Sequence, residues 1–323
     1  MSQPLEHQLV PYEAVKSLGR GPVLVFAPHP DDETLGCAGA IMRHLEAGDA
    51  VTVVMVTDGA FGPPAIRQAY LQTRQHEARC AASVLGYGEP IFWNLPDRGL
   101  VFEEALIDRI RASIEVEPSC LVYAPSWWEI HPDHRTLSLC VAEAIRRCRH
   151  DVALLMYEVG APLQPNRLLD ITVLHERKQA AIRCFASQLA NQAYDQHIAA
   201  LNRFRTYTLP AYVQFAEAYR LVTRHELLAD TDWAGFRSLL GLQQALLSQM
   251  QRTQALLIAQ AESSPTMLDF HAALDPGRQF CRPNGELRYP RDIDELDAIY
   301  KSTSWRITAP MRALGSYLRA WKR

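Results

Sequence analysis

The chain has 323 residues, 48% of them hydrophobic, and a formal net charge of −3 at pH 7. This length allows one large buried core or a core with an appendage, and the near-neutral charge excludes a broad electrostatic attraction to nucleic acid. No apolar run reaches the roughly 20 residues that a membrane-spanning helix needs, and the N-terminus lacks a secretory pattern. The seven cysteines have no Cys-x-x-Cys spacing, so we expect reduced thiols and a cytoplasmic protein.

The first predicted strand and helix enclose a strongly polar turn. Residues 23–27 form an apolar run typical of a strand, and helical spacing begins at about Thr34. Residues 27–33 read Ala-Pro-His-Pro-Asp-Asp-Glu, which places one imidazole and three carboxylates within five residues. Carboxylates so close repel one another unless a positive charge lies among them. The turn is therefore typical of a metal site, with His29 and Asp32 facing a common point, although spacing alone does not exclude Asp31 as the ligand.

The chain then repeats units of strand, polar loop and helix. We predict strands at residues 50–56, 91–93 and 120–124, and helices at residues 66–85, 102–116 and from the 131–134 loop to Cys148. The strands are nearly continuous apolar runs, as in parallel strands that helices cover on both faces. This alternation predicts a doubly wound α/β domain.

Four strand ends carry polar clusters: residues 29–33, Asp58, Asp97 and residues 131–134. The carboxyl ends of parallel strands meet at one edge of the sheet, where α/β proteins bind their ligands. Two imidazoles and one carboxylate from two loops could there surround one ion, which is the ligand set of a catalytic zinc with an open position. Helix capping by the His-x-x-His pair is the simpler alternative. A dinucleotide site is disfavoured, because the first turn lacks Gly-x-Gly-x-x-Gly and its carboxylates would repel a pyrophosphate.

Together these motifs resemble those of the PIG-L (LmbE-like) family of zinc-dependent de-N-acetylases. The resemblance rests on Ala-Pro-His-Pro-Asp-Asp-Glu-Thr-Leu-Gly from residue 27 and on His-Pro-Asp-His-Arg from residue 131. An Arg-x-x-Glu helix at residues 74–77, and segments at residues 166–172, 178–188 and 215–219, are similar to further family motifs. The resemblance covers about residues 22–224 and implies a Rossmann-like, mostly parallel sheet with helices on both faces.

The resemblance also implies roles for individual residues. It makes His29, Asp32 and His134 the metal ligands, with Zn²⁺ expected and Fe²⁺ also suited to this ligand set. Asp31 would be the general base toward the attacking water, and His131 would be an imidazolium that stabilises the oxyanion and protonates the leaving amine. Hydrolysis of an acetamide needs these parts, because water is a weak nucleophile and an amine is a poor leaving group.

Three further residues are candidates for contact with a sugar: Arg74, Asp97 and Trp127. Arg74 and Asp97 match positions that resemble sugar-contacting residues of the family, and the alternative for both is an ion pair between helix and loop. Trp127 and Trp128 lead into the second histidine motif. One of the two rings is expected to stack on a sugar while the other packs in the core.

The resemblance does not account for the end of the chain. We assign residues 1–228 to the deacetylase domain and predict a helical extension after it. Residues 229–262 are expected to form a long helix, which would suit a homo-oligomer. A linker at residues 263–300 and a tail are expected to follow. The tail, residues 301–323, contains six Lys or Arg residues and no acid, with apolar residues at helical spacing. This basic amphipathic pattern is typical of weak peripheral contact with the inner face of a membrane, and docking on the chain's own domain is the alternative.

The sequence thus predicts a metal-dependent hydrolase that removes the N-acetyl group from an N-acetylhexosamine in a glycoconjugate, such as a bacterial cell-surface glycan or its precursor. The alternatives are an amidase for a non-sugar N-acyl group and a metal-binding scaffold without activity, although a scaffold would need neither Asp31 nor His131. The expected partner is an N-acetylated sugar and not nucleic acid. Many family members have a glutamate after the second strand, where residues 60–61 are Ala-Phe here, so substrate contacts on that side stay open.

Overall fold

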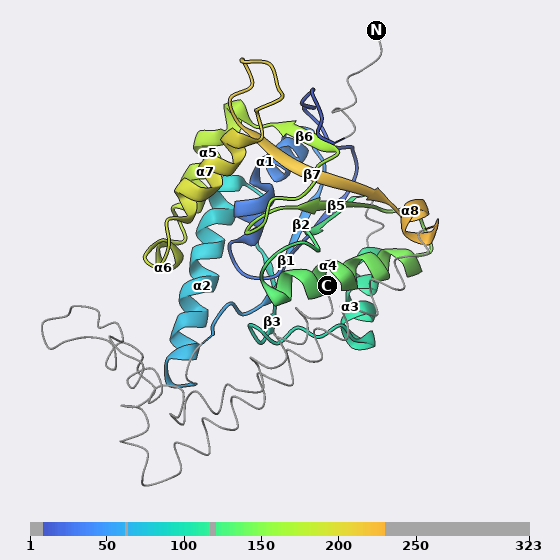
Figure 1. Ribbon diagram of the computed structural model, residues 1–323. Coiled ribbons are helices and arrows are strands. Elements are labelled where there is room, and N and C mark those ends of the chain that lie inside the picture. Colours follow the sequence, from blue (N-terminus) through green and yellow to red (C-terminus); the bar gives the residue numbers. More distant parts are fainter. Residues whose placement is uncertain (1–8, 62–63, 117–120, 230–323) are drawn as a thin grey trace, which may run out of the picture. The chain divides into compact units, whose positions relative to one another are not determined.

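The computed structural model describes residues 9–61, 64–116 and 121–229, which contain a seven-stranded sheet with helices on both faces (Figure 1). The segments predicted beyond residue 229, namely the long helix, the linker and the basic tail, lie outside the described residues and stay predictions.

The strands are β1 (Val23–Ala27), β2 (Val51–Thr57), β3 (Ile91–Leu95), β4 (Leu121–Pro125), β5 (Ala153–Tyr157), β6 (Arg167–Asp170) and β7 (Ala216–Thr223). The helices are α1 (Asp32–Glu46), α2 (Pro64–Leu85), α3 (Glu104–Val116), α4 (Pro132–Arg147), α5 (His175–Ile182), α6 (Ala186–Leu189), α7 (Tyr194–Phe204) and α8 (Arg224–Ala229), with a short 3₁₀ turn at Thr172–Leu174. The first four strands and helices confirm the predicted alternation, with ends that differ by a few residues.

The sheet is mostly parallel, as predicted. Its strand order is β3-β2-β1-β4-β5-β7-β6, and β7 runs antiparallel to both of its neighbours. In the register of the central strands, Val23 of β1 lies opposite Val51 on one side and Leu121 on the other. Every residue of β1 is buried, because helices cover both faces of the sheet there. This two-sided cover explains the continuous apolar run in the sequence.

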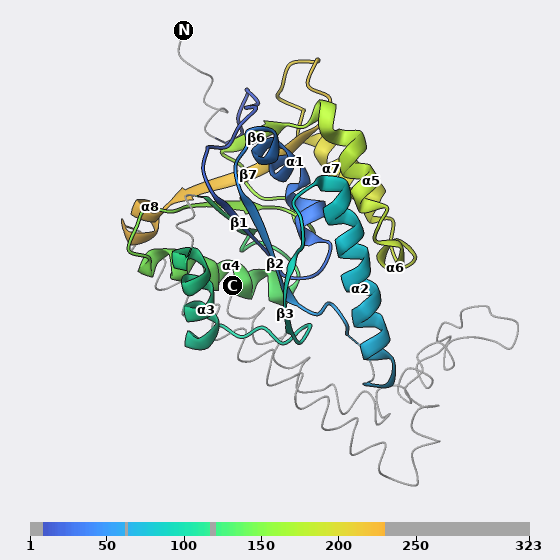
Figure 2. The same ribbon diagram turned by 180° about the vertical axis from the view of Figure 1, so that it is seen from behind.

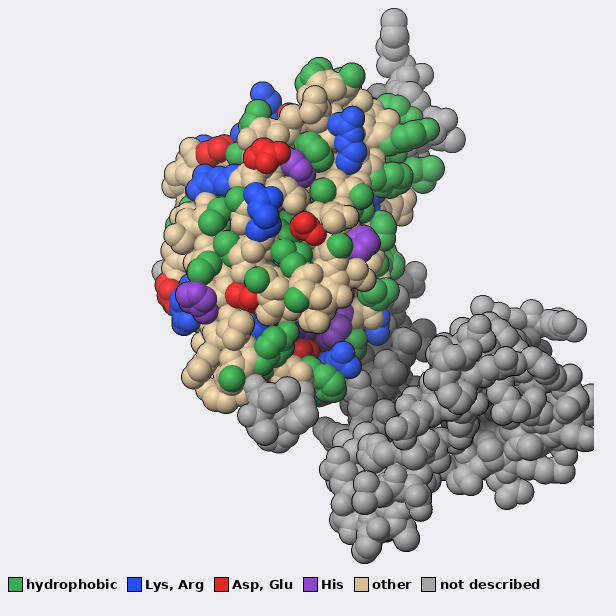
Figure 3. All heavy atoms as spheres, turned by 90° about the vertical axis from the view of Figure 1, so that its left-hand side faces the viewer, with side chains coloured by type: hydrophobic (Ala, Val, Ile, Leu, Met, Phe, Trp, Pro, Cys, Tyr) green, Lys and Arg blue, Asp and Glu red, His purple; other side chains and the backbone are tan. Residues whose placement is uncertain are grey.

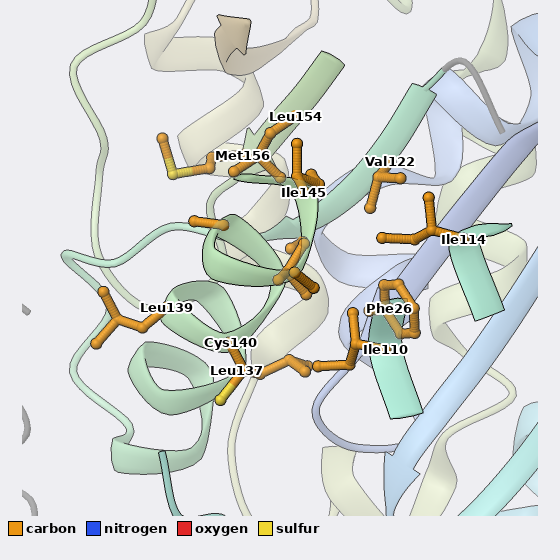
Figure 4. Close-up of a cluster of buried hydrophobic side chains, with 14 of the residues drawn as sticks. Phe26, Ile110, Ile114, Val122, Leu137, Leu139, Cys140, Ile145, Leu154 and Met156 are labelled. Atoms are coloured by element: carbon orange, nitrogen blue, oxygen red, sulfur yellow. The ribbon is translucent and has the colours of Figure 1, made fainter. Parts of the chain in front are cut away.

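The helices form two layers (Figures 1 and 2). Helices α1, α2, α5 and α7 cover one face of the sheet, and α3, α4 and α8 cover the other. Figure 4 shows part of the core under the second layer, where Phe26 of β1 lies close to Ile110 and Ile114 of α3 and to Leu137 of α4. Full burial of each such side chain contributes about 1.5–3 kcal/mol relative to exposure. The loops at the sheet edge are therefore carried by a firmly packed framework.

Two of these loops meet because of the strand order. Strands β1 and β4 lie side by side, but the chain continues from β1 through α1 to β2 on one side and from β4 through α4 to β5 on the other. Open α/β sheets bind ligands at such a switch point, outside the carboxyl ends of the strands. The two histidine motifs follow these two strands, so residues 29–33 and 131–134 meet although they are far apart in the sequence.

Helix α1 is broken in its middle and held there by a buried ion pair. Cys37 has non-helical dihedral angles (φ −142°, ψ 23°), and the N–H groups of Gly39 and Ala40 donate to the Glu217 carboxylate at 2.8 and 3.0 Å. The ammonium of Lys178, a fully buried residue, lies 2.7 Å from Glu217 Oε1 and neutralises the carboxylate. These contacts, made by segments that resemble family motifs, secure the helix that follows the first polar turn.

On the face shown in Figure 3, neither acidic nor basic side chains dominate. Both are mixed there with histidine and hydrophobic side chains. This agrees with the formal net charge of −3. Among the described helices, none combines the length and the hydropathy that crossing a membrane requires.

Candidate metal centre

The three predicted metal ligands meet at the carboxyl edge of the sheet. His29 and Asp32 come from the turn between β1 and α1, and His134 comes from the first turn of α4. His29 Nδ1 lies 3.1 Å from Asp32 Oδ2 and 3.2 Å from His134 Nε2, and His134 Nε2 lies 3.1 Å from the same carboxylate oxygen. Ligand atoms about 2.0–2.2 Å from a tetrahedral zinc lie roughly 3.3–3.6 Å apart, so this ligand triangle is close to the size that one ion needs.

The charge states of the three side chains also suit a cation. Burial opposes ionisation of Asp32, yet His134 and the hydrogen bonds from both rings hold the pKa of Asp32 far below its usual range. Burial likewise opposes protonation of His134, but the Asp32 carboxylate raises the pKa of His134 to about 9. Despite burial, hydrogen bonds to Asp133, Asp32 and Asp97 raise the pKa of His29 well above its usual value. The cluster therefore attracts positive charge, which a divalent ion would supply in place of the two ring protons.

A carboxylate that the sequence pattern does not single out supports His134 from behind. Glu129 Oε2 lies 3.4 Å from His134 Nδ1, and the same carboxylate accepts the backbone N–H groups of Val159 and Gly160 at 2.7 and 2.9 Å. Carboxylates placed in this way fix the orientation of metal-binding histidines and raise their basicity. The signal in the sequence was a glutamate two residues before His131.

Two carboxylates support the other ligand ring. His29 Nε2 lies 3.2 Å from Asp97 Oδ1 and 3.3 Å from Asp133 Oδ2. The Asp133 oxygens also accept the backbone N–H groups of Arg98, at 2.6 Å, and of Leu100, at 3.2 Å. Asp97 was predicted to contact a sugar, but its carboxylate faces a candidate metal ligand. Its contact with substrate stays a prediction.

Two other groups of side chains lie close enough to share an ion. In one, His131 joins His29 and His134, and in the other, His29 and His131 join Asp97 and Asp133, with the candidate ligand atoms within 4.8 Å of one another. Both oxygens of Asp133 already accept N–H groups, and its own N–H donates to His131 Nδ1 at 3.2 Å. The ligand triangle is tighter, with its three atoms 3.1–3.2 Å apart, so it is the better candidate.

Asp31, the neighbour of one ligand, faces a different partner. Its backbone has φ 147°, which residues other than glycine rarely adopt, and its Oδ2 lies 3.1 Å from Arg74 Nη2. The buried Arg74 also donates to the Pro30 carbonyl at 2.6 Å, and Gly59 leaves room for it, since a Cβ there would lie 3.2 Å from Arg74 Cζ. Burial raises the pKa of Asp31 to about 6 against the opposing charge of Arg74. Asp31 is thus a carboxylate with unusual basicity beside the ligand triangle.

Arg74 and Asp97 do not pair with each other, but Arg74 of α2 does form an ion pair with a loop residue. Arg74 pairs with Asp31, whereas Asp97 faces His29. The sequence could not show this, because the pairing depends on which strand ends lie next to each other in the sheet. The Arg74 guanidinium already contacts the Asp31 carboxylate and the Pro30 carbonyl. Contact between Arg74 and a sugar stays a prediction.

His131 lies beside the ligand triangle. Burial and the positive charges of His29 and His134 lower the pKa of His131 to about 4. The imidazolium that the resemblance implies stays a prediction, because a divalent ion at the ligand triangle would replace the ring protons of His29 and His134. The ring caps α4 by accepting the Asp133 N–H at Nδ1, so the neutral form carries its hydrogen on Nε2. Its centroid is 4.6 Å from that of His29, which places this N–H donor at the site.

Of the two tryptophans before the second motif, Trp128 is the exposed one. Trp127 is partly buried against the core under α3 and α4, whereas Trp128 is 45% exposed. As expected, one of the two rings packs against the core. That ring is Trp127, the predicted sugar contact, and the exposed ring is Trp128. Stacking of a sugar on Trp127 stays a prediction that these exposures do not favour.

The fold and the site define an α/β protein with a candidate metal centre at the switch point of its sheet. Residues 24–145, which include both histidine motifs, match the PIG-L family, described as GlcNAc-PI de-N-acetylase. The chain therefore contains a PIG-L family domain, as its motifs predicted.

The most similar curated proteins include deacetylases from bacteria and archaea. The chain is 28% identical over 191 residues to a probable N-acetyl-α-D-glucosaminyl L-malate deacetylase 2 of Bacillus anthracis, and the match covers 53% of this chain and 82% of the relative. It is 27% identical over 193 residues to the diacetylchitobiose deacetylase of Thermococcus kodakarensis, with 54% and 72% covered. Both relatives are named for substrates that contain N-acetylglucosamine.

Solved structures share the fold. The N,N′-diacetylchitobiose deacetylase of Pyrococcus horikoshii matches with a TM-score of 0.57 at 23% identity, over 65% of this chain and 88% of that one. GalB, the 4-carboxy-2-hydroxymuconate hydratase of Pseudomonas putida KT2440, matches with a TM-score of 0.53 at 23% identity, over 62% and 96%. Because a deacetylase and a hydratase both have this fold, the fold does not decide the reaction.

Proposed function

We propose that this protein is a metal-dependent hydrolase that removes the N-acetyl group from an N-acetylhexosamine in a glycoconjugate. The observation that carries the proposal is the ligand triangle of His29, Asp32 and His134 with the Asp31 carboxylate beside it. A scaffold that only binds metal has no use for a basic carboxylate held in a strained backbone conformation. The named relatives, deacetylases of N-acetylglucosamine compounds, favour a sugar over another N-acyl substrate.

The ligand triangle is the proposed metal site. Zn²⁺ is the proposed ion, and Fe²⁺ is the other ion that suits two imidazoles and one carboxylate. When bound, such an ion lowers the pKa of a water from 15.7 to about 7 and polarises a carbonyl oxygen. The proton transfers and the orientation of the substrate depend on the chain's own residues.

Asp31 is the proposed acid–base residue. It accepts a proton from the water that attacks the acetamide carbon, and its pKa of about 6 leaves it ionised at neutral pH while keeping it a useful base. The contact with Arg74 at 3.1 Å holds the carboxylate in place. When the C–N bond breaks, the proton on Asp31 passes to the amine nitrogen, so the carboxylate is restored and acetate is released.

His131 is the proposed donor to the carbonyl oxygen. Its neutral ring carries the hydrogen on Nε2, because Nδ1 accepts the Asp133 N–H. A fixed N–H aimed at the oxygen on which negative charge develops stabilises the transition state, and removal of one such donor costs about 10²–10³ in rate. This role differs from the imidazolium that the family resemblance implies, since no proton is lost from His131.

Acetate release from a panel of acyl compounds tests the proposal. The panel contains N-acetylglucosamine, diacetylchitobiose, an N-acetylglucosaminyl glycoside and N-acetyl amino acids, each assayed with Zn²⁺, with Fe²⁺ under anaerobic conditions, and with chelator. We expect release from the sugars that chelator abolishes and added metal restores. Release from the amino acids alone would favour the amidase, and no release with either metal would favour the scaffold.

We make a separate proposal of membrane contact for the basic tail. Residues 301–323 would bind an anionic membrane surface weakly and reversibly, with a gain of about 1 kcal/mol for each basic residue near it. Removal of these residues should leave hydrolysis of a soluble sugar intact and lower co-sedimentation with anionic vesicles at low salt. Unfolding or aggregation of the shortened chain would contradict the membrane contact. Light scattering of the full chain tests whether residues 229–262 support a homo-oligomer.

A further inference from the structure

An exposed arginine and an exposed aromatic ring form a pair beside the candidate metal centre. Phe61 follows β2 and is 63% exposed, and Arg98 follows β3. The guanidinium carbon of Arg98 lies 4.1 Å from the centroid of the Phe61 ring, within the range of a cation–π contact. The ring therefore restrains the direction of an arginine side chain that would otherwise sample many rotamers.

The backbone of Arg98 is tied to the support of a candidate metal ligand. Its N–H donates to Asp133 Oδ2 at 2.6 Å, and the same oxygen lies 3.3 Å from His29 Nε2. Arg98 also has φ 58°, in the left-handed region that few non-glycine residues occupy. One carboxylate thus separates the backbone of Arg98 from the ligand triangle, so this exposed side chain begins at the edge of the site.

Arg98 differs from Arg67 and Arg74 in having no carboxylate partner within the described residues. Arg67 pairs with Asp58, and Arg74 pairs with Asp31. The ion pairs of the described chain do not include Arg98, whose side chain is exposed. A guanidinium stacked on a ring keeps its N–H groups available at its edge, where they match the two oxygens of a carboxylate or a phosphate.

We propose that Arg98 and Phe61 form an anion subsite that recognises a carboxylate or phosphate on the group attached to the N-acetylhexosamine. The inference rests on the proposed function and names its substrate class: an N-acetylhexosamine linked to an anionic group. A neutral saccharide would use the Phe61 face but leave the guanidinium without an acceptor. The anionic group would pair with the guanidinium while the acetamide reaches the ligand triangle.

A comparison of three substrates tests the subsite. We would measure kcat/KM of the metal-loaded protein for methyl N-acetyl-α-glucosaminide, N-acetyl-α-glucosamine 1-phosphate and N-acetyl-α-glucosaminyl L-malate. The anionic substrates should be preferred, and Arg98→Gln should lower the ratio of anionic to neutral kcat/KM by about ten- to hundredfold, the usual effect of losing charge-assisted hydrogen bonds. The anionic substrate with the higher kcat/KM shows whether phosphate or carboxylate is the natural group.

The chain offers a matched control. Arg109 of α3 lies with its guanidinium carbon 4.0 Å from the centroid of the Trp93 ring, in the same kind of stacked pair but without a link to the ligand triangle. Arg109→Gln should leave the ratio of anionic to neutral kcat/KM within twofold of the wild type. An unchanged ratio in Arg98→Gln, or an equal fall in both variants, would overturn the subsite.

Binding without turnover separates the two proposals. Calorimetric titration uses metal-loaded Asp31→Asn protein, which is expected to keep the metal but to hydrolyse very slowly, and N-acetyl-α-glucosamine 1-phosphate. The Kd should be about tenfold or more weaker when Arg98→Gln is added than when Arg109→Gln or no further change is added. Equal Kd values in all three proteins would overturn the subsite even if the protein is a hydrolase. A selective loss with Arg98→Gln, without acetate release from any substrate by the wild type, would uphold the subsite and contradict the proposed hydrolysis.

Discussion

In the turn after β1, two neighbouring aspartates have different electrostatic surroundings. Asp32 faces both ligand rings and accepts the His29 backbone N–H at 2.9 Å, whereas Asp31 faces Arg74. The turn could be predicted as a metal site, because an imidazole and carboxylates this close require a cation, but spacing did not separate the two aspartates. The backbone does so: Asp31 lies before the first helical residue with φ 147°, so the two side chains reach different partners.

The variants His134→Ala and Asp31→Asn should separate metal binding from catalysis. The first removes one of three ligands, whereas the second keeps all three and removes the base. We expect His134→Ala protein without metal, and Asp31→Asn protein with full metal content and a rate about 10²–10⁴ lower. Elemental analysis and an acetate-release assay on the same preparations check this. An Asp31→Asn protein that arrives without metal would show that Asp31 is itself a ligand.

Glu129, which lies behind His134, should strengthen metal binding. Glu129→Gln removes the negative charge behind His134 and should weaken metal binding about 10–100-fold, measured by competition with a chromophoric chelator. Glu143→Gln is the matched control, since Glu143 is equally buried on α4 but pairs with Arg146 and Arg147. It should leave the Kd for metal unchanged. Similar losses in both variants would mean that Glu129 acts on the stability of the fold and not on the ligand.

Among the elements, α1 depends on a distant ion pair. The Glu217 carboxylate accepts two N–H groups freed by the break at Cys37, and Lys178 neutralises it. Glu217→Gln leaves the Lys178 ammonium buried without its counter-charge, which typically costs about 3–5 kcal/mol. We expect a loss of that order in the free energy of unfolding measured with urea, and partial recovery when Lys178→Met is added. A loss below about 1 kcal/mol would contradict the proposed dependence.

The turn that follows α1 makes the stability of the fold depend on pH. Burial raises the pKa of Asp49, but hydrogen bonds from His44, Gly21 and Arg20 outweigh it, and the pKa lies below its usual value. A carboxyl whose pKa is lowered by folding stabilises the fold above its unfolded pKa of about 3.9, and this contribution is lost as the pH falls through the folded pKa. Asp49→Asn should therefore lower the urea midpoint at neutral pH, and the difference from wild type should shrink below about pH 3.9. A difference independent of pH would contradict this.

The alternation of elements could be predicted up to Cys148 but not beyond. Up to that point, each apolar strand is followed by a polar loop and a helical pattern. The later strands depend on pairing between distant segments: Tyr157 of β5 lies opposite Tyr219 of β7, and Asp170 of β6 lies opposite Ala216. Strand β7 also carries a buried glutamate, which interrupts its apolar pattern and is stable there because of Lys178.

In the whole molecule, the strand order decides which loops share the site. The ligand triangle could be predicted because both histidine motifs are compact in the sequence. The supporting contacts could not be predicted. The loop after β5 holds the Glu129 carboxylate that faces His134. Asp97, after β3, meets His29, after β1, across the end of the intervening strand β2. Such contacts depend on the three-dimensional order of strands and leave no local pattern in the sequence.

The reaction depends on these side chains and not on the fold, which a deacetylase and a hydratase both have. The most direct measurement is acetate release from an N-acetylglucosaminide as metal-free protein is titrated with Zn²⁺. If the ligand triangle holds one catalytic ion, the rate rises linearly up to one equivalent of metal per chain, stays constant beyond it, and remains at background for His134→Ala throughout the titration. A rate that does not depend on added metal, or that His134→Ala retains, would contradict a catalytic metal at His29, Asp32 and His134.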